Sequence, residues 1–196
     1  MKAVLISIQP KWVEKIASGE KTIEVRKSMP KLKRPFKVYI YCTKEKSIYD
    51  MLLISNEKGF EKSVSFGDYR NHGFGWEIGN CKVIGEFVCD RIDELPCGVN
   101  QPYWLKEKTC ISNEDYKDYL GNKNGYGWHI SDLKIYDKQK ELSEFYQECK
   151  GICVDTAKKI LCLKIKTLKT LDGCDRKIPL KRPPQSWCYV EELKNG

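Results

Sequence analysis

Short apolar runs, separated by polar and charged residues, are the feature that most limits what this chain can fold into. Residues 3–8 and 36–42 are rich in β-branched and aromatic residues, which predicts two buried strands. The clearest strand is expected within residues 82–92. Further strands are expected at residues 22–26, 125–136 and 186–192. Together with two or three short helices, this pattern predicts an α+β fold, a small β-barrel with flanking short helices.

Two helices can be placed from local signals. Trp12, Val13 and Ile16 recur at helical spacing, and Gly19 follows them, where a left-handed residue ends a helix easily. The second helix is expected within residues 110–121. There the sequence SNED provides a capped start ahead of the apolar residues, and a glycine closes the segment.

The chain of 196 residues is predicted to form a single domain, residues 1–196. Residues 43–79 are rich in Lys, Ser, Gly and Asn, which predicts a long excursion with one short hairpin. Residues 146–182 are basic and contain cysteines, which predicts an insertion before the last strand. No internal repeat is visible, so a repeat architecture is not expected.

The charge of the chain favours a negatively charged partner. Lys and Arg total 35 against 27 Asp and Glu, a net charge of +8. Such a balance favours nucleic acids and other polyanions, although a lysine-rich solvated surface is the alternative. Residues 155–182 hold nine basic residues against three acids. A second basic cluster consists of Lys21, Arg26, Lys27, Lys31, Lys33 and Arg34.

No apolar run approaches the roughly 20 residues that a membrane span requires. The first residues, MKAVLISIQPKW, lack the small-residue cleavage site of a signal peptide. We therefore expect a cytoplasmic protein without a membrane partner. Partners among other proteins cannot be read from these residues.

Ten cysteines are present, and in a cytoplasmic protein they are expected to be reduced thiols. Four of them, spaced C-x3-C-x8-C-x11-C, lie in the basic segment: Cys149, Cys153, Cys162 and Cys174. Four thiolates can hold a structural zinc ion, and this would order a segment that has little core of its own. The alternative is scattered free thiols. No other cofactor is expected.

The segment IQPKWVEKIASGEKTIEVR brings chemically useful side chains together. Strand alternation places Glu24 and Arg26 on one face, and Lys21 lies in the turn that leads into the strand, close to Gln9 and Trp12. This group can bind an anion or a polar heterocycle. A lysine beside a carboxylate could also act as a base or a nucleophile. The alternative is an exposed strand with surface salt bridges.

The pattern W-x3-I-x2-G-x-K-T-x-E-x-R within this segment resembles the signature of the ASCH domain, a branch of the PUA-like superfamily. Its residues here are Trp12, Ile16, Gly19, Lys21, Thr22, Glu24 and Arg26. Two later segments, GYGWHISDLKIYDKQKELSEF and RPPQSWCYVEEL, resemble bacterial and phage-encoded members.

The resemblance implies a compact β-barrel with a cleft beside the strand of the motif, and a function in binding RNA or modified nucleosides. The resemblance implies that Lys21, Glu24 and Arg26 line the cleft, and that Gln9, Ser7 or Trp12 lies at its edge. Three aromatics in the resembling segments, Tyr126, Trp128 and Trp187, would stack on a base, or else belong to the core. His129 could reach the cleft or pack elsewhere.

Some small ASCH proteins resemble amidohydrolases that deacetylate acetylated cytidine nucleosides. Their pattern uses a lysine at the position of Lys21 and a threonine three residues later, where this chain has Glu24. It also uses a distal glutamate, for which Glu86 is the nearest candidate. A carboxylate at position 24 pairs with the lysine and keeps it protonated, which makes it a poor nucleophile. We therefore expect a binding module. The alternatives are a nucleoside amidohydrolase or a ribonuclease that uses Lys21 with Glu24 or Glu86 as catalytic residues, or an accessory protein that contacts other proteins.

Overall fold

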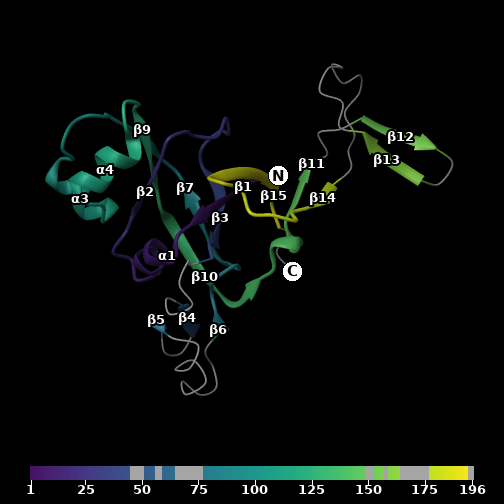
Figure 1. Cartoon of the computed structure of the whole chain (residues 1–196), viewed down its shortest axis with the longest axis horizontal. Helices are drawn as coiled ribbons and strands as arrows, with labels where there is room; N and C mark the ends of the chain where they lie inside the picture. The colour runs from purple at the N-terminus through teal and green to yellow at the C-terminus, as the bar shows by residue number, and fades with distance from the viewer. Residues whose placement is uncertain are drawn as a thin grey trace.

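A five-stranded mixed sheet forms the centre of the fold (Figure 1). The structure is a computed structural model, and it describes residues 1–44, 51–55, 59–64, 77–148, 152–156, 159–163 and 177–193. Strand β1 runs parallel to β3, and the other neighbours in this sheet are antiparallel. In sheet order, the strands are β10 (Ser131–Lys140), β7 (Val83–Cys89), β3 (Phe36–Cys42), β1 (Lys2–Ile8) and β15 (Trp187–Glu191).

Both faces of this sheet are covered, and this explains the continuous apolar run at the start of the chain. Val4 and Ile6 point into one hydrophobic core, and Ala3 and Leu5 point into another. All four side chains are fully buried. A strand that is covered on both faces has to be apolar on both, so its sequence does not alternate.

A second sheet has three strands, in the order β2 (Ile23–Arg26), β9 (Gly125–His129) and β8 (Ile92–Leu95). Strand β8 follows β7 directly and β9 runs into β10, so one long ribbon bends from the first sheet into the second. The predicted strands 82–92 and 125–136 are therefore each divided by this bend. The α+β class is confirmed. Among the described strands no ladder joins β2 to β1 or β15, and closure into a barrel stays a prediction.

Three α-helices of the described part of the chain lie beside the sheets: α1 (Pro10–Ala17), α3 (Tyr103–Thr109) and α4 (Asn113–Leu120). Helix α1 ends just before Gly19, whose φ of +80° is the left-handed conformation that glycine adopts without strain. The Ser112 hydroxyl caps α4 by accepting a hydrogen bond from the backbone N–H of Asp115 at 3.0 Å. Among the described residues, no helix is long and apolar enough to cross a membrane.

The sequence signals found α1 and α4 but not α3. This helix has seven residues, and Pro102 stands directly before it without a side-chain cap. Its end at Cys110 adopts a left-handed conformation, which separates α3 from α4. The helix predicted within residues 110–121 corresponds to α4, with the cap at Ser112 and the end at Gly121 as expected.

The excursion after β3 contains a small three-stranded sheet rather than a single hairpin. Strand β4 (Met51–Ser55) pairs with β5 (Gly59–Val64) on one side and with β6 (Glu77–Ile78) on the other. The three strands lie below the central sheet in the view of Figure 1.

The basic segment before β15 contains two pairs of short strands. Strand β11 (Tyr146–Glu148) pairs with β14 (Lys177–Pro179), so the two ends of the predicted insertion lie side by side. Between them, β12 (Ile152–Thr156) and β13 (Lys159–Leu163) form an antiparallel pair, drawn away from the central sheet in Figure 1.

Candidate ligand-binding cleft

Strand β2 alternates between apolar and charged residues, and both of its faces are buried. Ile23 and Val25 pack into a core with residues of α3 and α4. Glu24 and Arg26 point to the opposite face and are only 5% and 7% exposed. This burial excludes the alternative of an exposed strand with surface salt bridges.

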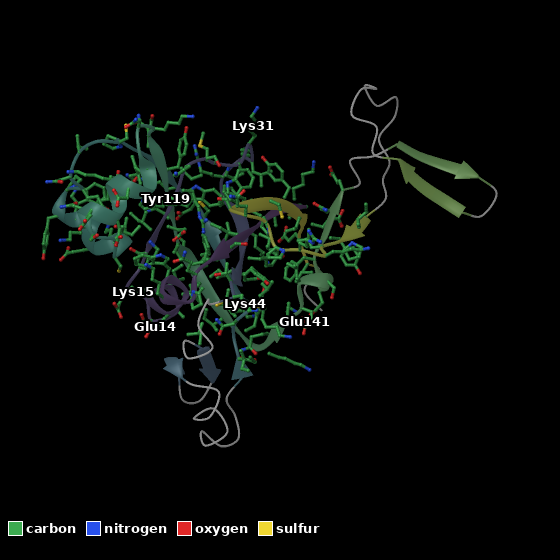
Figure 2. All side chains as sticks on the ribbon, viewed as in Figure 1. Glu14, Lys15, Lys31, Lys44, Tyr119 and Glu141 are labelled. Atoms are coloured by element: carbon green, nitrogen blue, oxygen red, sulfur yellow. The ribbon has the colours of Figure 1, made fainter. Side chains whose placement is uncertain are left out.

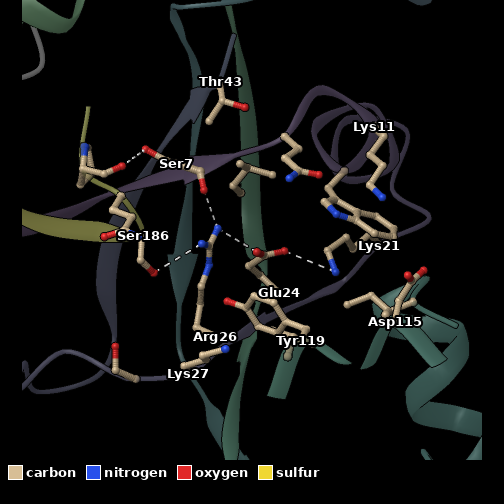
Figure 3. Close-up of a pocket in the computed structure, with 18 of the residues that line it drawn as sticks. Ser7, Lys11, Lys21, Glu24, Arg26, Lys27, Thr43, Asp115, Tyr119 and Ser186 are labelled. Carbon is tan, nitrogen blue, oxygen red and sulfur yellow. Dashed lines mark hydrogen bonds and ion pairs between the residues drawn. The ribbon is translucent and has the colours of Figure 1, made fainter. Parts of the chain in front are cut away.

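Arg26 connects β2 to the central sheet. Its Nη2 atom donates a hydrogen bond to the Ser7 carbonyl oxygen at 2.7 Å and lies 2.9 Å from Glu24 Oε1. Its Nη1 atom donates to the hydroxyl of Ser186 at 3.5 Å. Ser7 belongs to β1, and Ser186 directly precedes β15. The guanidinium therefore spans the gap between the two sheets (Figure 3).

Glu24 also holds Lys21, which lies in the turn before β2. The Lys21 ammonium lies 3.3 Å from Glu24 Oε2 and donates a hydrogen bond to the Thr109 carbonyl oxygen at 2.7 Å. The Lys21 residue is 1% exposed, and its nitrogen lies 5.3 Å from the centre of the Trp12 ring. One carboxylate thus bridges two buried cations. We call Lys21, Glu24 and Arg26 the buried ion network.

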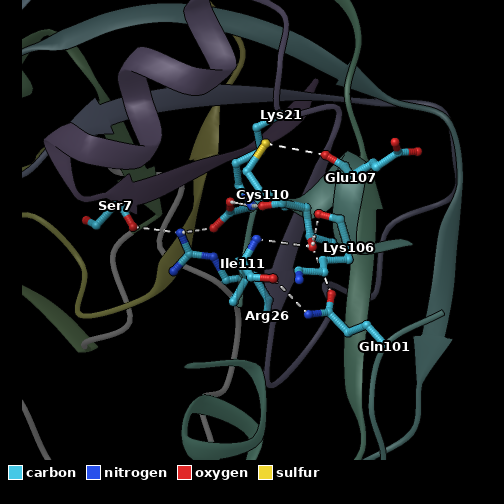
Figure 4. Close-up of polar contacts among 10 residues, drawn as sticks. Ser7, Lys21, Arg26, Gln101, Lys106, Glu107, Cys110 and Ile111 are labelled. Atoms are coloured by element: carbon cyan, nitrogen blue, oxygen red, sulfur yellow. Dashed lines mark hydrogen bonds and ion pairs between the residues drawn. The ribbon is translucent and has the colours of Figure 1, made fainter. Parts of the chain in front are cut away.

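The carbonyl that accepts from Lys21 is held in place at the end of α3. The Thr109 hydroxyl donates to the Gln101 side-chain oxygen at 2.8 Å, and the Gln101 amide donates to the Ile111 carbonyl at 3.1 Å (Figure 4). Thr109 and Gln101 are buried. These bonds tie the α3–α4 connection to the floor of the site.

Burial lowers the pKa of the Lys21 amine below its usual value of 10.5, because removal from water disfavours the ammonium. The charge of Glu24 acts in the opposite direction but is weaker. With two cationic groups and one carboxylate, the buried ion network carries an excess of positive charge when Lys21 is protonated. An anion placed against it would stabilise that state.

Two atoms of the network are buried without a hydrogen-bond partner among the described residues, Glu24 Oε2 and Arg26 Nε. The Lys21 ammonium lies near Glu24 Oε2, but the geometry of that contact is that of an ion pair and not of a hydrogen bond. Buried polar atoms are nearly always bonded in native proteins. Both atoms are shielded from solvent, so an ordered water is the partner that suits them.

The buried ion network forms the floor of a cleft of about 850 Å³ (Figure 3). This volume falls within the range of roughly 300–1,000 Å³ that is typical of small-molecule sites. The walls come from β1, α1, α4 and the segment before β15. Besides the network, the lining comprises Ser7, Ile8, Gln9, Lys11, Trp12, Val25, Lys27, Ser28, Thr43, Ile111, Asp115, Tyr119, Pro183, Pro184, Gln185 and Ser186.

The rim of the cleft combines lysines with aromatic rings. The Lys11 nitrogen lies 4.7 Å from the centre of the Trp12 ring, and the Lys27 nitrogen lies 5.1 Å from that of Tyr119. Both lysines and Tyr119 are exposed. Figure 2 shows Tyr119 on the side of the molecule that carries α4, and Lys31 extending to solvent from the loop after β2.

The structure places five of the predicted ligand-binding residues in this cleft: Gln9, Trp12, Lys21, Glu24 and Arg26. The three aromatic candidates do not line it. Trp128 is fully buried against Phe36, with ring centres 6.0 Å apart. Trp187 packs beside Trp128 and donates a hydrogen bond from its indole nitrogen to Ser28 at 3.1 Å. Tyr126 is partly buried and packs against the same core.

Two further candidates also lie outside the cleft lining. Glu86 accepts a hydrogen bond from Tyr136 at 2.6 Å and pairs with Lys37 at 3.1 Å. His129 lies 2.8 Å from a carboxylate oxygen of Asp93. Burial acts to raise the pKa of Asp93, but hydrogen bonds from Arg91 and His129 outweigh it and lower that pKa below 3.8.

Sequence reasoning did not identify Lys11, Lys27, Asp115 or Tyr119 as lining residues, nor the run from Pro183 to Ser186. The signal for that run was available, because it belongs to the resembling segment RPPQSWCYVEEL. Asp115 and Tyr119 are four positions apart on α4, so they share one face of the helix. Nothing in the local pattern says which face meets the cleft.

Of the four cysteines proposed to bind zinc, Cys149 and Cys174 lie outside the described residues. The backbones of Cys153 and Cys162 are opposite each other in the β12–β13 pair. Within the described part of the chain, no group of three or more metal-ligating side chains is present.

Comparison with protein families matches the ASCH domain over residues 6–182. Among solved structures, a serine-to-alanine mutant of ZmASCH from Zymomonas mobilis matches with a TM-score of 0.51 and 15% identity, covering 97% of this chain and 89% of that one. A tyrosine-to-phenylalanine mutant of the same protein has a TM-score of 0.44 at 18% identity, covering 72% and 77%. The match to the serine-to-alanine mutant supports a fold shared with ZmASCH. No curated protein matches the sequence.

Proposed function

The chain belongs to the ASCH domain family, a PUA-like family generally tied to RNA binding, and from this we propose that it binds RNA through the cleft above the buried ion network. The proposed ligand is one phosphate-bearing nucleotide of an RNA strand, including a nucleotide with a modified base. Lys21, Glu24 and Arg26 would organise the floor, and the rim would contact the base and the backbone.

The observation that carries this proposal is the charge of the cleft floor. Two cations share one carboxylate there, at 3.3 Å and 2.9 Å. Charge buried without full compensation is costly, so a ligand with a negative group is favoured over a neutral one. A phosphate supplies that charge, and Arg26, which lines the cleft, supplies a cationic partner for it.

The rim supports a nucleotide rather than a simple anion. Lys11 and Lys27 are exposed and can contact phosphates on either side of a bound nucleotide. Tyr119, which is 37% exposed, presents a ring on which a base can stack. Asp115 is an exposed acceptor in the same lining and suits an exocyclic amino group.

The contacts of the candidate catalytic groups favour binding over hydrolysis. The Lys21 nitrogen is buried and already bonded to the Thr109 carbonyl and paired with Glu24. Glu86 is held by Tyr136 and Lys37 and does not line the cleft. Neither group presents a free reactive atom to a ligand in the cleft.

The test compares nucleosides, nucleoside monophosphates and a fluorescently labelled single-stranded RNA of about ten nucleotides, in a length range typical of single-strand binding sites. We expect monophosphates to bind more tightly than the matching nucleosides. For RNA, the logarithm of the affinity should fall linearly with the logarithm of salt concentration. Equal affinity for nucleosides and monophosphates would contradict the proposed role of the floor.

Lys27→Ala and Lys138→Ala form a matched pair of variants. Both lysines are exposed, but only Lys27 lines the cleft, and Lys138 lies on β10. Lys27→Ala should weaken RNA binding and reduce the salt slope by about 0.7, the value for one phosphate contact on a single strand. Equal effects of the two variants would contradict the cleft assignment. If the native protein converts one of these ligands to a product and Lys21→Met does not, the protein is instead a hydrolase.

A further inference from the structure

Helix α3 exposes large apolar side chains that nothing in the described fold covers. Tyr103 is 77% exposed and Trp104 is 49% exposed, and Val99 in the preceding loop is 47% exposed. Solvent-exposed aromatic residues that lie together commonly mark an interaction surface. We call Val99, Tyr103, Trp104 and Lys108 the α3 surface.

The chemistry of this surface repeats that of the cleft rim. The Lys108 nitrogen lies 5.9 Å from the centre of the Trp104 ring, one helical turn away on α3. The rim has two such pairs, Lys11 with Trp12 and Lys27 with Tyr119. An exposed ring beside a cation suits a base stacked on the ring and a phosphate near the ammonium.

The pair of Lys140 with Tyr136 shows why exposure matters. The Lys140 nitrogen lies 5.4 Å from the centre of the Tyr136 ring. Tyr136, however, is buried, and its hydroxyl donates to Glu86. The Tyr136 ring therefore has no free face on which a base could stack. The Lys108–Trp104 pair on α3 is more accessible and in this respect resembles the two pairs at the cleft rim.

Helix α3 is fixed directly to the strand that carries the cleft. The Thr22 backbone N–H donates to the Lys108 carbonyl at 2.9 Å, and the Lys21 ammonium donates to the Thr109 carbonyl. Leu105 is buried in the core that also contains Ile23. The α3 surface is therefore joined to the strand that carries the buried ion network.

We infer that the α3 surface is a second contact region for single-stranded nucleic acid, in which Trp104 and Tyr103 stack on bases outside the cleft and Lys108 contacts the backbone. This inference rests on the proposed function, because the same strand would place one nucleotide in the cleft. The surface adds affinity for strands that are long enough to reach it. A partner protein is the competing occupant, and the excess of Lys106 and Lys108 over the single acid of this helix, Glu107, favours the polyanion.

The test measures binding of a nucleoside monophosphate and of labelled single-stranded RNAs of increasing length, up to about twelve nucleotides. Trp104→Ala should weaken binding of the longest RNA by about 5- to 150-fold, the range for the loss of one base stack. It should leave the affinity for the monophosphate unchanged. Trp104→Phe, which keeps a ring, should recover most of the loss.

Tyr146→Ala provides the matched control, because Tyr146 is a 41% exposed aromatic on β11. It should bind every RNA as the native protein does. If Trp104→Ala binds the long RNA like Tyr146→Ala, the α3 inference is wrong. If Trp104→Ala weakens RNA binding but Lys27→Ala does not, the α3 surface stands and the cleft function fails. Unchanged melting of Trp104→Ala in urea checks that its fold is intact.

Discussion

Replacement of Glu24 by glutamine tests the buried ion network most sharply. The substitution keeps the shape of the side chain and removes the single negative charge that two cations share. Glu24 Oε1 lies 2.9 Å from Arg26 and Oε2 lies 3.3 Å from Lys21. Lys21 is 1% exposed and Arg26 is 7% exposed. Glu24→Gln therefore leaves two buried basic groups without the carboxylate that they share.

The magnitude follows from these distances. With an effective dielectric constant of about 20, each pair attracts by about 5 kcal/mol, and most of this offsets the cost of removing the charges from water. Removal of one partner of a buried pair typically costs about 3–5 kcal/mol. We expect a loss of this size in the free energy of unfolding, from a total of about 5–15 kcal/mol for an ordinary domain.

Urea denaturation, followed by circular dichroism and tryptophan fluorescence, measures the loss. The midpoint should fall while the slope of the transition stays unchanged, because the surface exposed on unfolding is the same. The double variant Lys21→Met with Glu24→Gln should be more stable than the sum of the single effects predicts, since it removes one of the two stranded cations. A loss below about 1 kcal/mol for Glu24→Gln, the level of a surface pair, would refute the reasoning.

Three further outcomes are expected. Burial raises the pKa of Tyr39 and of Cys89 to about 12, from 10.0 and 9.0. As the pH rises, the unfolded chain therefore releases these protons before the folded protein does. The free energy of unfolding should fall between about pH 9 and about pH 12, and it should fall less in Tyr39→Phe. Urea denaturation at several pH values across that range measures this. Gly85→Ala would place a Cβ 2.5 Å from the Lys134 carbonyl oxygen and should destabilise the protein by about 1–3 kcal/mol in the same assay; an unchanged midpoint would show that the strands separate easily. If the four cysteines of the basic segment hold zinc, metal analysis of protein purified without added metal should find about one equivalent, and less than about a tenth would exclude the site.

The local pattern was sufficient for the residues that lie close together in the sequence. Lys21, Glu24 and Arg26 are separated by two and one residues, and strand geometry alone predicts that they converge. Strand alternation does not tell whether a polar face meets water or another part of the protein. Here Arg26 contacts Ser7 and Ser186, which lie 19 and 160 positions away. Such long-range contacts leave no local signal.

The positions of the aromatic candidates also depend on contacts that the local sequence does not reveal. Trp128 is directly opposite Glu24 in the β2–β9 pair, so the two side chains share one face of the second sheet. The register alone would place Trp128 beside the cleft. The central sheet covers this part of the face, and the Phe36 ring packs against the indole in a T-shaped arrangement.

Helix α3 was not predicted because seven residues give too few turns for a periodic signal.

A nuclear magnetic resonance titration of the native protein with a nucleoside monophosphate tests the central claim most directly. The backbone amide signals that shift should belong to the cleft, among them those of Ser28, Tyr119 and Gln185. Signals from the opposite side of the central sheet, such as those of Glu86 and Tyr136, should stay unchanged. Shifts that gather around Glu86 and leave the cleft unaffected would contradict the account.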